Sequence, residues 1–148
     1  MPLPVSLPTA AVRVSRPALV AFGESLGRSM TPPHVVALSG DLGAGKTTLV
    51  RGFLRAAGYT GAVKSPTYTL VEEYTIGDRK ILHFDLYRVA DPEELEWIGI
   101  RDYFDQDCVC FIEWPDMGKG FLPEPDRVIS LIVDGSGRSV EMLIPPQH

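Results

Sequence analysis

The 148-residue sequence contains no asparagine, only four lysines and no apolar run long enough to span a membrane. Without asparagine, it cannot hold the Asn-Lys-x-Asp element with which GTPases bind guanine. The few lysines and the net charge of −5 argue against a surface that binds nucleic acid non-specifically. Residues 1–11 lack the basic start and apolar core of a secretory signal. We therefore expect a cytoplasmic protein with no membrane contact, whose contacts with RNA or DNA are local or supplied by another protein.

The sequence has only two cysteines, Cys108 and Cys110, which stand two apart in an apolar run. On a strand they point to the same face, in a geometry too extended for an unstrained disulfide. A metal site would need two more soft ligands, and the three histidines (His34, His83 and His148) are scattered. We interpret the two cysteines as buried thiols in a reducing cytoplasm.

Residues Gly40–Thr47 spell G-x-x-x-x-G-K-T, a complete phosphate-binding loop. The apolar run Val35–Leu38 before it predicts a buried strand, and Lys46–Ala57 after it predicts a helix. In this setting backbone N–H groups at a helix N-terminus face a bound polyphosphate, and the glycines allow its close approach. Lys46 would reach the β- and γ-phosphates, and the Thr47 hydroxyl would ligate Mg²⁺. The sequence therefore predicts nucleoside triphosphate binding, and the missing guanine element favours adenine.

The length suits one domain with a substantial core and is too small for two. With 45% hydrophobic and 22% charged residues, the chain is expected to be globular. We assign residues 1–148 to a single domain, with an N-terminal arm at 1–14 and a short tail at 145–148.

Two further helices are predicted, from a Ser15 cap to about Met30 and from the Asp91 cap to about Phe104. Gly58 is expected to end the helix that starts at Lys46. The core candidates on the two further helices are Leu19, Phe22, Leu26 and Met30, and then Leu95, Ile98 and Tyr103.

The strands are expected to alternate with helices at first and to form hairpins later. This order predicts an α/β three-layer or mixed-sheet domain. The predicted strands are Tyr68–Tyr74 and Lys80–Asp85 around a Gly77-Asp78 turn, Cys108–Glu113, and a C-terminal hairpin of Arg127–Val133 and Ser139–Ile144.

Two acids end apolar strands, where ligands of open α/β sheets bind: Asp85 and Glu113. Each alone could equally be a solvated strand-end carboxylate, but two of them beside a phosphate loop favour a functional interpretation. The Ser65-Pro66-Thr67 segment falls where switch-type NTPases sense the γ-phosphate. The Thr67 hydroxyl could meet Mg²⁺ or orient water, although the tripeptide alone is also typical of an ordinary turn.

Five segments have a characteristic order: GDLGAGKTT at 40–48, SPTYTLVEEY at 65–74, HFDLYR at 83–88, DPEELEWIG at 91–99 and IEWP at 112–115. In this order they resemble the bacterial TsaE family, formerly YjeE. The resemblance extends from Ser15 to about Ile144. It implies a P-loop NTPase-like fold with a mixed, largely parallel sheet. It also implies an ATPase required for making threonylcarbamoyladenosine in tRNAs that read codons beginning with A.

The resemblance also implies the site and its cofactors, ATP and Mg²⁺. By the resemblance, Thr47 and Glu113 are expected to hold Mg²⁺ and Asp85 to act near the γ-phosphate. Together with the motif analysis, we expect Asp85 and Thr67 to position water and Lys46 to take part in catalysis. The expected nucleotide contacts are Asp41, Leu42, Gly43, Ala44, Gly45, Lys46, Thr47, Thr48, Trp114, Met117 and Arg138.

The implied partners are the proteins TsaD and TsaB, with tRNA bound only indirectly through their complex. Ser65–Tyr74 is expected to change order between the ATP and ADP states and so to reset that complex. Two alternatives remain open. One is a small-molecule kinase, although the sequence lacks an arginine-dense lid, and the other is a regulatory module that uses ATP only to lock a conformation.

Overall fold

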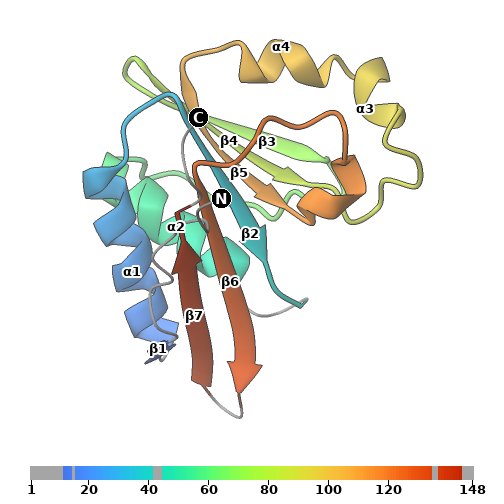
Figure 1. Cartoon of the computed structure of the whole chain (residues 1–148). Coiled ribbons are helices and arrows are strands. Elements are labelled where there is room, and N and C mark those ends of the chain that lie inside the picture. The colour runs from blue at the N-terminus through green and yellow to red at the C-terminus, as the bar shows by residue number, and fades with distance from the viewer. Residues whose placement is uncertain (1–11, 15, 42–44, 135–136, 145–148) are drawn as a thin grey trace, which may run out of the picture.

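The computed structural model describes residues 12–14, 16–41, 45–134 and 137–144 (Figure 1). For residues 12–14, 16–18, 134 and 137–139 the description covers the backbone only. The strands are β1 (Val12–Val14), β2 (His34–Ser39), β3 (Val71–Ile76), β4 (Arg79–Asp85), β5 (Cys108–Glu113), β6 (Arg127–Asp134) and β7 (Gly137–Leu143). The helices are α1 (Arg16–Ser29), α2 (Lys46–Ala57), α3 (Glu94–Trp97), α4 (Ile100–Phe104) and the 3₁₀ helix η1 (Pro115–Gly118).

The described strands form one seven-stranded sheet in the order β1-β7-β6-β2-β5-β4-β3. Its centre is parallel, because β2 pairs in parallel with both β5 and β6, and β5 with β4. Antiparallel pairings complete both edges, where β3 pairs with β4 and β7 with β6 and β1. The mixed, largely parallel sheet and the C-terminal hairpin are confirmed.

Helices cover both faces of the sheet, which confirms the three-layer prediction (Figure 1). On one face α1 and α2 pack over alternate strand residues such as Val36, Leu38 and Phe111. On the other face the α3–α4 segment packs over Leu82, Phe84 and their neighbours. Strand β5 lies inside the sheet between β2 and β4, and all of its residues are buried, as expected for a parallel strand covered on both sides. Among the described helices, none combines the length and hydrophobicity that a bilayer span requires.

Helix α2 begins and ends where the sequence predicted, and the hairpins lie where their turn residues indicated. Gly58 follows α2 in the left-handed conformation and its N–H bonds to the Arg55 carbonyl. Leu19 and Leu26 in α1 and Met30 just after it are buried as predicted, and Phe22 packs partly buried against the same core. The expected Ser15 cap lies outside the described residues.

The predicted strand Tyr68–Tyr74 is wrong at its start, since β3 begins at Val71. The preceding residues form a turn in which the Leu70 N–H bonds to the Pro66 carbonyl, and Leu70 has a left-handed backbone with φ 73°. A left-handed residue cannot continue a strand. Tyr68 is therefore not on a sheet face but 83% exposed, with the Arg88 guanidinium 4.4 Å from its ring centroid.

The predicted helix from Asp91 to Phe104 is also wrong, because two short helices replace it. Gly99 adopts φ 71° between α3 and α4 and breaks the helical path. Leu95 is buried and Tyr103 packs partly buried against the same core. Ile98 faces outward at the break, 43% exposed, so its predicted place in the core is wrong.

Part of the predicted N-terminal arm is a strand, since β1 pairs antiparallel with β7 at the sheet edge. The cysteine interpretation is confirmed in the described chain: Cys108 and Cys110 are buried free thiols on one face, with their Sγ atoms 3.4 Å apart. The hydrogen bond from Cys110 lowers the pKa of Cys108. The same bond, together with burial, raises the pKa of Cys110.

Candidate functional site

The candidate site lies at the carboxyl ends of β2, β4 and β5, around the start of α2. Gly45 caps α2 with φ 106°, and a Cβ added there would lie 2.4 Å from the Leu19 Cδ2 atom. Glycine is favoured at this position because the left-handed backbone is strained for residues with a Cβ, and a Cβ would also displace the Leu19 side chain. The start of α2 thus packs closely against α1.

Lys46, the first residue of α2, is 5% exposed although it carries a charge. Its Nζ donates to the Gly40 carbonyl at 2.6 Å and lies 3.4 Å from Glu113 Oε1. The same ammonium lies 4.6 Å from the centroid of the Trp114 ring. The cation is thus held by a carbonyl, a carboxylate and an aromatic face.

Glu113 has a second buried partner, His83. The His83 Nε2 atom is hydrogen-bonded to Glu113 Oε2, and His83 is fully buried on β4. Lys46, Glu113 and His83 therefore form one chain of contacts from α2 across β5 to β4. This chain satisfies the buried carboxylate on both oxygens, as a buried charge requires.

Asp85 is joined to the predicted switch segment. The Thr67 hydroxyl donates to Asp85 Oδ2 at 3.2 Å, and the Tyr87 N–H donates to Oδ1 at 2.9 Å. Ser65 Oγ lies within 2.8 Å of Thr67 Oγ1, and the Asp85 N–H donates to the Leu70 carbonyl. Asp85 also pairs in register with Glu113, so the two strand-end acids lie on neighbouring strands.

Trp114 follows Glu113 with a left-handed backbone, φ 56°. Its indole contacts both the Lys46 ammonium and the Tyr87 ring, whose centroid is 5.0 Å away. The indole N–H is buried and has no hydrogen-bond partner among the described residues. Such an N–H is free to donate to a ligand.

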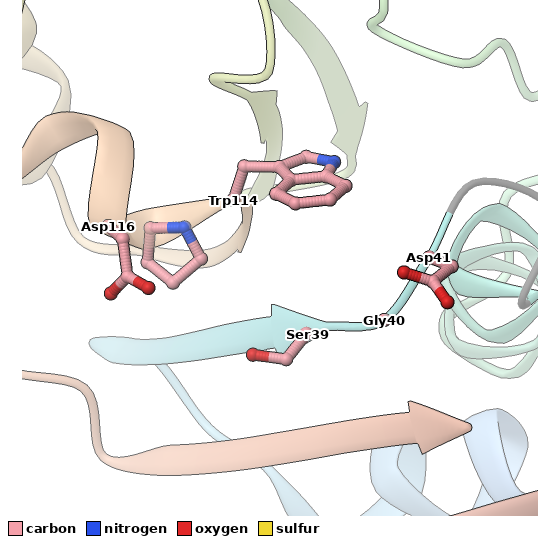
Figure 2. Close-up of a pocket in the computed structure, with 6 residues that line it drawn as sticks. Ser39, Gly40, Asp41, Trp114 and Asp116 are labelled. Carbon is pink, nitrogen blue, oxygen red and sulfur yellow. The ribbon is translucent and has the colours of Figure 1, made fainter.

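A cavity of about 240 Å³ lies between the two loops that end β2 and β5. Figure 2 shows Trp114 and Asp116 on one side of it and Ser39, Gly40 and Asp41 on the other. A small polar or charged ligand placed there would lie beside the start of the phosphate loop. The cavity is open to solvent, which suits a site that exchanges ligand.

The remaining predicted contacts are only partly described. Leu42, Gly43 and Ala44 lie outside the described residues, as does the side chain of Arg138, whose backbone belongs to β7. Asp41 is exposed, Thr47 half-buried and Thr48 buried. Met117 lies on η1, 36% exposed, and does not line the cavity. The roles assigned to these residues stay predictions.

Sequence reasoning gave His83 no role. A usable signal was present, because strand residues alternate between faces and His83 precedes Asp85 by two. The pattern therefore placed His83 on the same face as a predicted catalytic acid. Its contact with Glu113 depended on the strand order, which the pattern did not contain.

Comparison with known proteins identifies one family. The protein-family model described as "Threonylcarbamoyl adenosine biosynthesis protein TsaE" matches residues 14–140 of this sequence. A tRNA threonylcarbamoyladenosine biosynthesis protein TsaE from Haemophilus influenzae is 50% identical over 131 residues, which cover 85% of this chain and 83% of that protein. Its counterpart from Borreliella burgdorferi is 36% identical over 131 residues, covering 86% and 94%. The crystal structure of Bacillus subtilis YdiB superposes with a TM-score of 0.79 at 27% identity, covering 99% of this chain and 90% of that one.

Proposed function

The chain belongs to the TsaE family of tRNA threonylcarbamoyladenosine biosynthesis proteins, and we propose that it is the Mg²⁺-dependent ATP hydrolase of that system. It hydrolyses ATP to reset a complex of TsaD and TsaB during modification of tRNAs that read codons beginning with A. The observation that carries the proposal is the buried pairing of Lys46, at the phosphate loop, with Glu113, at a strand end.

The residues present fit a nucleotide. The Lys46 ammonium bonds to the carbonyl of Gly40, the first residue of the phosphate-loop motif, and a phosphate oxygen can replace that contact. The α2 N-terminus adds backbone N–H groups and partial positive charge. We assign phosphate binding to this loop and to Lys46, Thr47 and Thr48, with Trp114 alongside.

The residues also fit Mg²⁺, which prefers oxygen ligands. The Thr47 hydroxyl, in the first turn of α2, and the Glu113 carboxylate are the oxygen donors that we assign to it. Mg²⁺ held there would supply positive charge beside the phosphates of the nucleotide. The chain itself orients the carboxylate and keeps the start of α2 fixed against α1.

We assign the orientation of the attacking water to Asp85 and Thr67. Both Asp85 oxygens already accept hydrogen bonds, from the Thr67 hydroxyl and the Tyr87 N–H, so the carboxylate is held in one orientation. A fixed carboxylate next to a hydroxyl can position water without a large reorganisation.

The switch role belongs to Ser65–Tyr74. This segment contains an exposed turn, and its Leu70 carbonyl accepts the Asp85 N–H. A change in the turn therefore alters the surroundings of Asp85 directly, and a partner bound to the turn would alter hydrolysis. We propose that TsaD and TsaB read the state of this segment, and that tRNA contacts the ATPase only through them.

Single-turnover ATP hydrolysis, measured alone and with TsaD and TsaB, tests the proposal. We expect slow hydrolysis that rises when the partners are added. Glu113→Ala should weaken Mg²⁺-dependent nucleotide binding, whereas Asp85→Ala should spare binding and slow hydrolysis. Asp105→Ala, an exposed carboxylate on the other side of the sheet, is the matched control. Hydrolysis that needs a small-molecule acceptor would instead indicate a kinase, and binding without turnover in the full complex would indicate a regulatory module.

A further inference from the structure

His83 is a buried polar side chain that the proposed chemistry leaves without a role. It is fully buried on β4, on the face covered by α1 and α2. Its Nε2 atom bonds to Glu113 Oε2, and its Nδ1 atom has no hydrogen-bond partner among the described residues. Among the described residues, the Glu113 carboxylate is therefore the one hydrogen-bond partner of the His83 ring.

The two oxygens of Glu113 have different partners. Oε2 accepts from His83, and Oε1 faces the Lys46 ammonium at 3.4 Å. With Glu113 ionised, as a Mg²⁺ ligand is, its carboxylate only accepts hydrogen bonds, so we assign the proton of this contact to the His83 Nε2 atom. Oε2 thus points into the protein and Oε1 toward the phosphate loop.

The separate partners of the two Glu113 oxygens become important when Lys46 moves from Glu113 to a bound phosphate. Glu113 is 4% exposed, so a carboxylate that lost its only partners would be buried without compensation. His83 lies on β4, away from the loop, and keeps its contact when Lys46 leaves. Glu113 then stays paired through Oε2 while Oε1 becomes available on the side of the loop.

We propose that His83 is a positioning residue that holds Glu113 so that Oε1 can ligate Mg²⁺; the inference rests on the proposed function. We assign His83 no direct contact with the nucleotide. A partner of this kind that orients a metal ligand commonly changes metal affinity 10- to 100-fold when it is removed.

Two amide variants test the position of the donor. In His83→Gln the side-chain N–H₂ falls near the place of Nε2 and can still donate to Glu113. In His83→Asn it falls near the place of Nδ1 and cannot reach. Calorimetric ADP titration with Mg²⁺ and with EDTA gives the Mg²⁺-dependent gain in affinity for each variant, and circular dichroism confirms the fold.

We expect the wild-type gain in His83→Gln and a gain reduced about 10- to 100-fold in His83→Asn, with ADP affinity in EDTA unchanged. Equal gains in the two variants, or equal losses with and without Mg²⁺, would overturn the inference. If the ADP affinity of the wild-type protein does not depend on Mg²⁺, that result would instead contradict the proposed function. If His83→Asn fails to fold, the ¹H–¹⁵N spectrum of the His83 ring in the wild-type protein provides the test. The inference requires the proton on Nε2 both with and without Mg²⁺·ADP. A spectrum in which Nε2 carries no proton would overturn the inference.

Discussion

Lys46 is predicted to stabilise the nucleotide-free fold as well as to bind phosphate. It is buried and lies 3.4 Å from Glu113 Oε1. At that distance, and with an effective dielectric constant of about 20, two unit charges attract by about 5 kcal/mol. Desolvation of both groups offsets most of this attraction. We expect a coupling of about 1–3 kcal/mol between the two side chains in the free energy of unfolding.

A double-mutant cycle with Lys46→Met and Glu113→Gln measures this coupling. Methionine keeps most of the apolar stem of Lys46 and removes the charge, which leaves the Glu113 carboxylate with His83 alone. Lys46→Met should therefore lower the free energy of unfolding by about 2 kcal/mol, and Glu113→Gln should recover part of that loss. Urea unfolding without nucleotide, followed by circular dichroism, gives each value.

The control is the exposed pair of Lys80 and Glu73, whose N···O distance is 3.3 Å with side chains 34% and 48% exposed. Because solvent screens this pair, Lys80→Met should change stability by less than about 1 kcal/mol. Additive effects of Lys46→Met and Glu113→Gln, or a Lys46→Met change no larger than that of Lys80→Met, would refute the buried pairing. The same Lys46→Met variant should bind ATP about 10- to 100-fold more weakly, because it loses a charge-assisted contact.

Three further outcomes are expected. Gly99→Ala should lower the free energy of unfolding by about 1–2 kcal/mol, because alanine resists φ 71°; unchanged urea stability would contradict the helix break seen between α3 and α4. Burial lowers the pKa of His34 below its ordinary 6.5, with Asp126 acting in the opposite direction. The unfolded chain therefore binds more protons as the pH is lowered through about 6.5, so the free energy of unfolding should decrease as the pH is lowered through that range. His34→Gln should remove this part of the pH dependence in urea unfolding curves, and a variant whose pH dependence matches that of the wild type would show the assignment to be wrong. The isolated chain, with net charge −5, should bind tRNA weakly at near-physiological salt in filter assays, and submicromolar affinity that falls steeply with salt would reveal a basic face.

Local sequence signals were sufficient to predict the structure of segments whose conformation depends on their own residues. The phosphate-loop motif, the bounds of α2, and the turn residues between β3 and β4 and between β6 and β7 all depend on neighbouring residues. The apolar runs before them placed Asp85 and Glu113 at strand ends, and these ends do lie side by side in the sheet. Such signals need only short-range sterics, capping and side-chain periodicity.

Only the tertiary structure decided the features that join distant segments. Gly99 and Leu70 adopt left-handed backbones where the helical and strand patterns continue, because packing of the flanking elements outweighs weak local preferences. The residues at Val12–Val14 become a strand only because β7 offers a free edge. The contact of His83 with Glu113, and of Lys46 with the same carboxylate, exists because the sheet order sets β4 beside β5 and β5 beside β2. Strand order depends on contacts between segments far apart in the chain, and a periodicity confined to one segment carries no information about them.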